Sequence, residues 1–174
     1  MATKCKSSFE SKFYNKRRKC LYDVLGDGKI RPNQLFALSL TYPVLDPKSE
    51  EARNMFETVT KKLLNNYGLK SLAKGEENYV EVYEGDGARR DFSYHQGITW
   101  PWLLGPYNDA FLNIIYAEKS KSEKNNLIEH HQKFVEKLNS LGNPILANNI
   151  CIILQEKNQS NIRNLKEISL TQMK

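Results

Sequence analysis

The strongest constraint on the fold is a run of apolar residues at helical spacing between Asp46 and Gly68. Steps of three and four residues, the period of one helix face, separate Ala52, Met55, Phe56, Val59 and Leu63. We expect Asp46 to cap this helix, Pro47 to occupy its first position and Gly68 to end it. The segment therefore predicts an amphipathic helix.

Helical patterns also occur elsewhere in the chain. Dense apolar residues predict a buried helix over 33–45, and a helical pair follows at 99–119 and 122–141. Residues 7–15 are expected to be the end of a helix, because their aromatic residues fall at helical spacing. Together these segments predict an all-α fold class with about two helical hairpins whose long loops gather at one end.

Other segments lack a helical period. Glycines mark a turn at 26–28, and residues 69–96 are expected to form a functional loop because they are too long for a simple connection. All 18 aromatic residues lie before Gly142, so we divide the chain into a domain of residues 1–141 and a divergent, loosely ordered tail of residues 142–174. The tail is either a plain polar extension or the product of a changed reading frame.

The positive charge of the chain is concentrated at one end. The net charge is +6, and residues 1–35 hold nine Lys and Arg against three Asp and Glu, so the excess lies there. The basic run at residues 16–19 is typical of either a nucleic-acid contact or a solvated turn. No nucleic-acid-binding motif accompanies it, and we expect no nucleic-acid partner.

Several classes of protein are disfavoured by what the sequence lacks. No apolar stretch of about 18 residues and no signal-peptide pattern occurs, so we expect a cytoplasmic protein without a membrane partner. Three widely spaced cysteines predict reduced thiols. The pair His130-His131 has no third ligand at suitable spacing, and we expect neither a metal nor a cofactor.

Two polar and aromatic clusters, at residues 27–34 and 89–107, mix charged, amide and indole groups in a way that packing alone does not require. Sugar hydroxyls both donate and accept hydrogen bonds, and the C–H faces of a sugar ring suit aromatic side chains. The clusters therefore predict a sugar-binding site. Its candidate residues are Asp27, Arg31, Asn33, Gln34, Asp91, His95, Gln96, Trp100 and Trp102.

Two of these assignments have structural alternatives. Arg31 and Asp91 also have the charges for a buried ion pair that ties the two clusters together. Trp102, at helical spacing, also suits the core. In either case we expect the loops ending at Gln34 and Gln96 to meet in space as one wall of a glucose-sized cavity.

The same clusters carry a family resemblance. The string YEGDGARRDFSYHQGITWPWLLGPY at Tyr83–Tyr107 resembles the C-terminal amylo-α-1,6-glucosidase domain of glycogen-debranching enzymes. Three further strings match the family in the same order: CLYDV at Cys20–Val24, IRPNQLFALSL at Ile30–Leu40 and YGLKSL at Tyr67–Leu72. The resemblance, over roughly residues 7–140, implies a partial (α/α)6 toroid and a ligand such as glycogen or an α-glucan limit dextrin. One departure is Ile98-Thr99, where the family has Thr-Val.

The resemblance also implies an inverting glycoside hydrolase, whose reaction needs two carboxyl groups. The family acid lies in a Thr-Trp-Met-Asp-like motif and its base in a Ser-Glu-Ile-Phe-Asp-Gly-like motif, and neither string occurs in this sequence. We therefore assign no catalytic residue and expect a fragment that binds glucan but is inactive by itself. One alternative is a non-catalytic subunit that completes a split debranching enzyme or associates with itself. A basic nucleic-acid-binding protein is the other.

Overall fold

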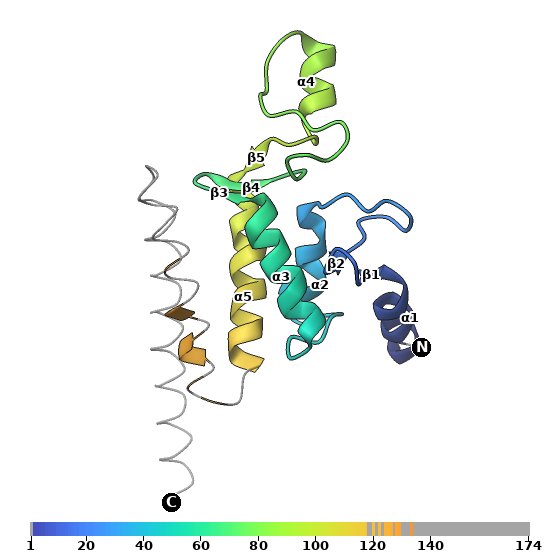
Figure 1. Cartoon of the computed structure of the whole chain (residues 1–174), viewed down its shortest axis with the longest axis vertical. Helices are drawn as coiled ribbons and strands as arrows, with labels where there is room; N and C mark the ends of the chain where they lie inside the picture. Colours follow the sequence, from blue (N-terminus) through green and yellow to red (C-terminus); the bar gives the residue numbers. More distant parts are fainter. Residues whose placement is uncertain are drawn as a thin grey trace, which may run out of the picture.

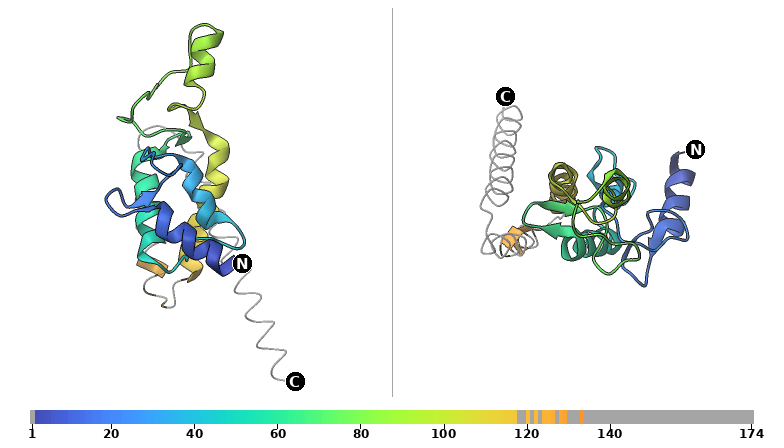
Figure 2. Two further views of the ribbon diagram at one scale, coloured as in Figure 1. Left: turned by 90° about the vertical axis from the view of Figure 1, so that its right-hand side faces the viewer. Right: turned by 90° about the horizontal axis from the view of Figure 1, so that it is seen from above.

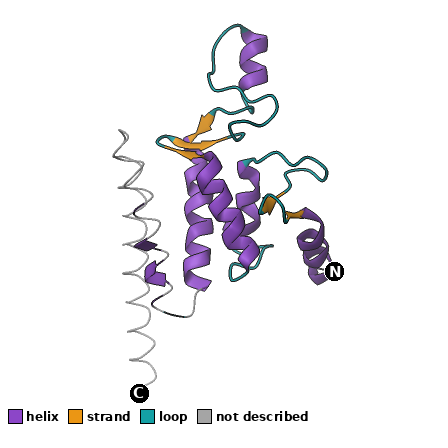
Figure 3. Cartoon of the chain, in the orientation of Figure 1, coloured by secondary structure: helices purple, strands orange, loops and turns teal. Residues whose placement is uncertain are grey.

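The computed structural model of the protein describes residues 2–117 and positions 120, 122, 124–126, 128, 129 and 133 (Figures 1 and 3). The helical elements, including two short 3-10 helices (η), are α1 (Ala2–Phe13), η1 (Pro32–Leu35), α2 (Phe36–Ser39), α3 (Glu50–Leu63), α4 (Gly87–Ser93), η2 (Pro101–Leu103) and α5 (Leu104–Ala117). The strands are β1 (Tyr14–Asn15), β2 (Cys20–Leu21), β3 (Leu64–Asn65), β4 (Gly68–Lys70) and β5 (Thr99–Trp100).

Helices α2, α3 and α5 pack side by side and enclose the core (Figures 1 and 2). We call these three helices the bundle. Phe56 of α3 stacks on Tyr107 of α5 with ring centroids 4.7 Å apart, and the Tyr107 hydroxyl lies 2.9 Å from Oγ1 of Thr60. The buried polar end of Tyr107 thus has a hydrogen-bond partner, as a buried hydroxyl requires.

Helix α3 confirms the amphipathic pattern, but its ends differ from the prediction. Oγ of Ser49 accepts a hydrogen bond from the Ala52 amide at 3.1 Å, so Ser49 rather than Asp46 is the N-cap. The Asp46 carboxylate instead accepts from the Lys48 amide in the turn that precedes the helix. At the other end the helix stops at Leu63, so Gly68 does not end it.

The helix expected over 33–45 is shorter in the structure. Its regular part ends at Ser39, and Leu40 has extended backbone. The chain then turns back, and the Leu45 amide donates to the Ala37 carbonyl at 2.9 Å. Pro43 accounts for part of this, because a proline disfavours helical backbone in the residue before it and lacks an amide hydrogen of its own.

Two small antiparallel sheets, β1-β2 and β3-β4-β5, show that the all-α prediction holds only in part. The strands are two or three residues long, too short to display an alternating pattern in the sequence. Gly68 has its role here rather than at a helix end. Its φ is +148°, and a Cβ at this position would lie 2.7 Å from the Trp100 carbonyl oxygen. Glycine is thus required for β4 to approach β5 this closely.

The segment 69–96, predicted to be a loop, contains a helix, α4. Asp86 caps α4 by accepting from the Arg89 amide at 2.9 Å. We call residues 79–93 the α4 segment. It projects away from the bundle (Figure 1), and every residue from 81 to 92 is exposed.

Some predictions lie outside the described residues. They concern the tail at 142–174, the pair His130-His131, Cys151 and most of the helix expected at 122–141. Within the described part of the chain, Cys5 and Cys20 are free thiols. None of the helices traced there is long and apolar enough to cross a membrane.

Candidate functional site

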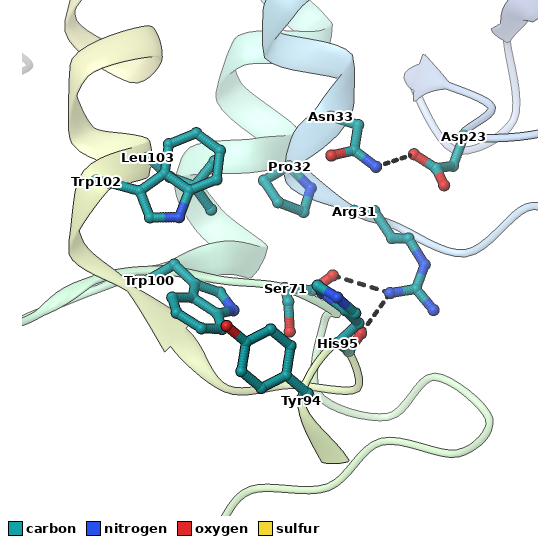
Figure 4. A pocket seen from close by; sticks show the side chains of 10 residues that line it. All are labelled: Asp23, Arg31, Pro32, Asn33, Ser71, Tyr94, His95, Trp100, Trp102 and Leu103. Carbon is teal, nitrogen blue, oxygen red and sulfur yellow. Dashed lines mark hydrogen bonds between the residues drawn. The ribbon is translucent and has the colours of Figure 1, made fainter. Parts of the chain in front are cut away.

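The two polar clusters meet at a cavity of about 430 Å³, a size typical of small-ligand sites (Figure 4). One side comes from the chain leading into η1 and the other from the chain between α4 and α5. The lining residues are Asp23, Arg31, Pro32, Asn33, Ser71, Tyr94, His95, Trp100, Trp102 and Leu103.

Arg31 holds the two sides together. Its Nη1 donates to the carbonyl oxygens of Ser71 at 3.1 Å and His95 at 2.6 Å (Figure 4). Its Nη2 donates to Oε1 of Gln96 at 3.0 Å. These contacts confirm that the loops ending at Gln34 and Gln96 meet. The alternative in which Arg31 pairs with Asp91 is wrong, because the guanidinium binds the Gln96 loop through these oxygens and Asp91 is exposed on α4.

The side of the cavity contributed by β5 and η2 is aromatic. The rings of Tyr94 and Trp100 make an edge-to-face contact with centroids 4.7 Å apart. The Trp102 side chain is 61% exposed, so it belongs to the cavity surface and not to the core. Gly68 positions this wall, since it allows β4 to approach β5 closely.

The opposite side carries a carboxylate beside an amide. Asp23 follows β2, Asn33 lies in η1, and Nδ2 of Asn33 donates to Oδ1 of Asp23 at 2.9 Å. Asp23 is half-buried, and among the described lining residues it supplies the one carboxylate.

Five of the nine predicted site residues line this cavity: Arg31, Asn33, His95, Trp100 and Trp102. The other four lie elsewhere. The Asp27 carboxylate accepts from the Lys29 amide in its own turn, and Gln96, outside the lining, accepts from Nη2 of Arg31. Buried Gln34 accepts from the Leu21 amide and donates to the Arg31 carbonyl. Asp91 lies on the exposed α4 segment.

Three polar or aromatic lining residues were not among the predicted site residues: Asp23, Ser71 and Tyr94. Each lies inside a string that carries the family resemblance. Membership of these strings could therefore have identified all three as candidate site residues. Thr99, one of the two residues that depart from the resembled motif, does not line the cavity. Its Oγ1 accepts from Nδ2 of Asn65 at 2.7 Å.

The arrangement suits a neutral ligand with many hydroxyl groups. Aromatic faces on one side and hydrogen-bonding oxygens on the other match the two kinds of surface on a sugar ring. Within the part of the chain that the structure covers, no group of three or more His, Cys, Asp or Glu residues is placed to hold a metal ion.

The basic run at residues 16–19 lies away from this cavity, in the turn between β1 and β2. Lys16, Arg17 and Lys19 are exposed there, whereas Arg18 folds back onto Glu76 with Nη2 2.5 Å from Oε1. A solvated turn accounts for three of the four side chains, and an ion pair accounts for the fourth.

A family model described as amylo-alpha-1,6-glucosidase matches residues 1–154, which include all ten lining residues and extend past Gly142.

Proposed function

The chain belongs to the amylo-alpha-1,6-glucosidase family of glycogen-debranching enzymes, and we propose that its cavity binds an α-glucan such as glycogen or its limit dextrin. The observation that carries this proposal is the juxtaposition of Trp100 and Trp102 with the Asp23–Asn33 pair across one cavity. Indole faces pack against the C–H face of a glucosyl ring while the polar pair binds its hydroxyls.

We further propose that the helical part of the chain is a section of an (α/α)6 toroid. The side-by-side packing of α2, α3 and α5 and the position of the cavity at one end of the bundle support this architecture (Figures 1 and 4). The two small sheets then belong to the loops and not to the helical ring.

The chain by itself is proposed to bind glucan without hydrolysing it. Inverting glycosidases use two carboxyl groups on opposite sides of the bond, about 6.5–9.5 Å apart. Of the described residues that line the cavity, Asp23 alone has a carboxylate, and neither family acid–base motif occurs in the sequence. Glucose release then depends on carboxyl groups beyond those that these 174 residues bring to the cavity.

The proposal that the cavity binds a glucan is tested by titrating the full chain with maltotriose and following tryptophan fluorescence. The chain has two tryptophans, Trp100 and Trp102, and both line the cavity, so the signal reports directly on the site. Binding measured by calorimetry should weaken about tenfold in Trp102→Ala. The matched control is Tyr67→Ala, which removes an aromatic side chain of similar exposure (66%) outside the cavity. An equal loss in both variants, or no binding by the native chain, contradicts the proposal.

An apolar groove of about 290 Å³ between α1 and α2 favours a second candidate function, assembly with the remaining parts of a debranching enzyme. Phe9 and Phe13 line it from α1, and Phe36 lines it from α2. The test mixes this chain with chains that carry the two carboxylate motifs and measures glucose release from limit dextrin. Release in the mixture alone supports assembly. Release by this chain alone contradicts the proposal that it is inactive.

A further inference from the structure

Asp23 differs from the other described lining residues of the cavity in being a carboxylate, and one of its two oxygens is bound by no described residue. Its Oδ1 accepts from Asn33, and its Oδ2 has no hydrogen-bond partner in the part of the chain that the structure describes. The neighbouring Arg31 has Nη1 and Nη2 engaged by protein oxygens. One group available to a ligand on this side of the cavity is therefore an acceptor with negative charge, the free carboxylate oxygen of Asp23.

The orientation of the pair follows from its chemistry. If the Asn33 amide were turned over, its oxygen would face the carboxylate oxygen, and two acceptors would oppose each other. With Nδ2 towards Asp23, the amide fixes one carboxylate oxygen and leaves the other for a hydroxyl donor (Figure 4). Asp27, four residues later, lacks this freedom, because its carboxylate contacts Lys29 and lies outside the cavity.

We propose that Asp23 is a specificity-determining residue: its carboxylate, oriented by Asn33, accepts a hydrogen bond from a glucosyl hydroxyl and disfavours phosphorylated sugars. This inference rests on the proposed glucan binding. The hydroxyl bond is charge-assisted and therefore stronger than a neutral one. The same charge repels a phosphate placed beside it, and the Nη1 and Nη2 donors of Arg31, which keeps its positive charge, are already engaged by protein oxygens.

The test compares Asp23→Asn, which keeps the size of the side chain, with Asp27→Asn as the matched control. Affinity of the full chain is measured by calorimetry for maltose, for maltose 6′-phosphate and for maltosides that each lack one hydroxyl. We expect Asp23→Asn to weaken maltose binding about tenfold or more. We also expect it to narrow the preference for maltose over its phosphate by about tenfold. Asp27→Asn should change neither value by more than about twofold.

The deoxy sugars separate a direct contact from a structural effect. For the maltoside that lacks the contacted hydroxyl, native and Asp23→Asn chains should bind with equal affinity, because the interaction is already absent. If Asp23→Asn weakens every sugar equally, or leaves maltose binding and the phosphate preference unchanged while the native chain binds, this inference is overturned and glucan binding stands. If the native chain binds no maltose, the proposed function itself fails.

Discussion

The bundle and the α4 segment differ in how each is held in place. In the bundle, the side chains of Leu38, Met55 and Tyr107 are fully buried, and their hydrophobic contacts run between helices. In the α4 segment every residue from 81 to 92 is exposed, and the segment is joined to the body mainly through hydrogen bonds at its ends. One of these runs from the Val80 amide to the Gln96 carbonyl at 2.6 Å.

The cavity lies where these two regions meet. Asn33, on one side of the cavity, lies in η1, directly before helix α2 of the bundle. His95, on the other side, lies two residues after the end of the α4 segment. Packing of buried side chains therefore holds the bundle, whereas the exposed α4 segment adds little to the core. Variants can therefore be chosen that affect one part and leave the other nearly intact.

The largest contrast is expected from truncating one apolar side chain in each region. Leu38→Ala should lower the free energy of unfolding by about 2–5 kcal/mol, because it leaves a cavity among buried side chains. Phe92→Ala, which removes a side chain that is 55% exposed, should change it by less than about 0.5 kcal/mol. Urea unfolding followed by circular dichroism measures both. Comparable losses would show that the α4 segment is part of the core.

A smaller contrast is expected from two glycines. Gly68→Ala should destabilise the chain by roughly 2 kcal/mol, since it forces a positive φ and pushes a Cβ against the Trp100 carbonyl. Gly87→Ala, at the start of α4, meets open space and should be neutral or slightly stabilising. Thermal unfolding of the two variants gives the comparison, and a tolerated alanine at position 68 would contradict the close approach of β4 to β5.

The junction itself is tested through Arg31. Arg31→Met keeps the aliphatic stem but removes three hydrogen bonds, and it should cost about 1–2 kcal/mol of stability. Amide hydrogen exchange should rise at residues 96–100 and stay unchanged in α3. The control is Arg90→Met, which removes a single exposed bond to the Gly85 carbonyl. Faster exchange throughout α3 would mean that Arg31 supports the bundle and not the junction.

The smallest expected effect is a pH dependence of the free energy of unfolding, caused by two buried groups in the bundle and in the neighbouring β1-β2 hairpin. Burial raises the pKa of Cys20 above 9.0 and that of Tyr107 above 10.0, so the folded state favours their protonated forms. Their contribution to the free energy of unfolding is complete below about pH 9 and is lost as the pH rises through the folded-state values. Urea titrations at several pH values should show this fall, and Cys20→Ala should reduce its slope. An unchanged slope would assign the fall to other groups.

The sequence predicted the helices of the bundle and the meeting of the two loops. It did not predict which polar residues of the loops line the cavity and which hold the loops together. Periodicity identified α3 because its buried residues recur every three or four positions. It could not reveal two-residue strands, nor that α2 ends at Ser39. Residue type suggested Asp27 and Gln34 as ligand contacts, yet Asp27 closes a turn and Gln34 is buried, because hydrogen bonding to the protein's own backbone uses the same chemistry as sugar binding.

The bridge made by buried Gln34 between the Leu21 amide and the Arg31 carbonyl has a practical consequence for altering which sugar the cavity accepts. Adjacent positions in the Arg-Pro-Asn-Gln string tolerate change unequally. A library that varies Asn33, whose side chain is exposed, while retaining Pro32 and Gln34 should yield mostly folded proteins. A library that randomises Gln34 as well should yield mostly unfolded ones, since it leaves buried backbone groups without partners.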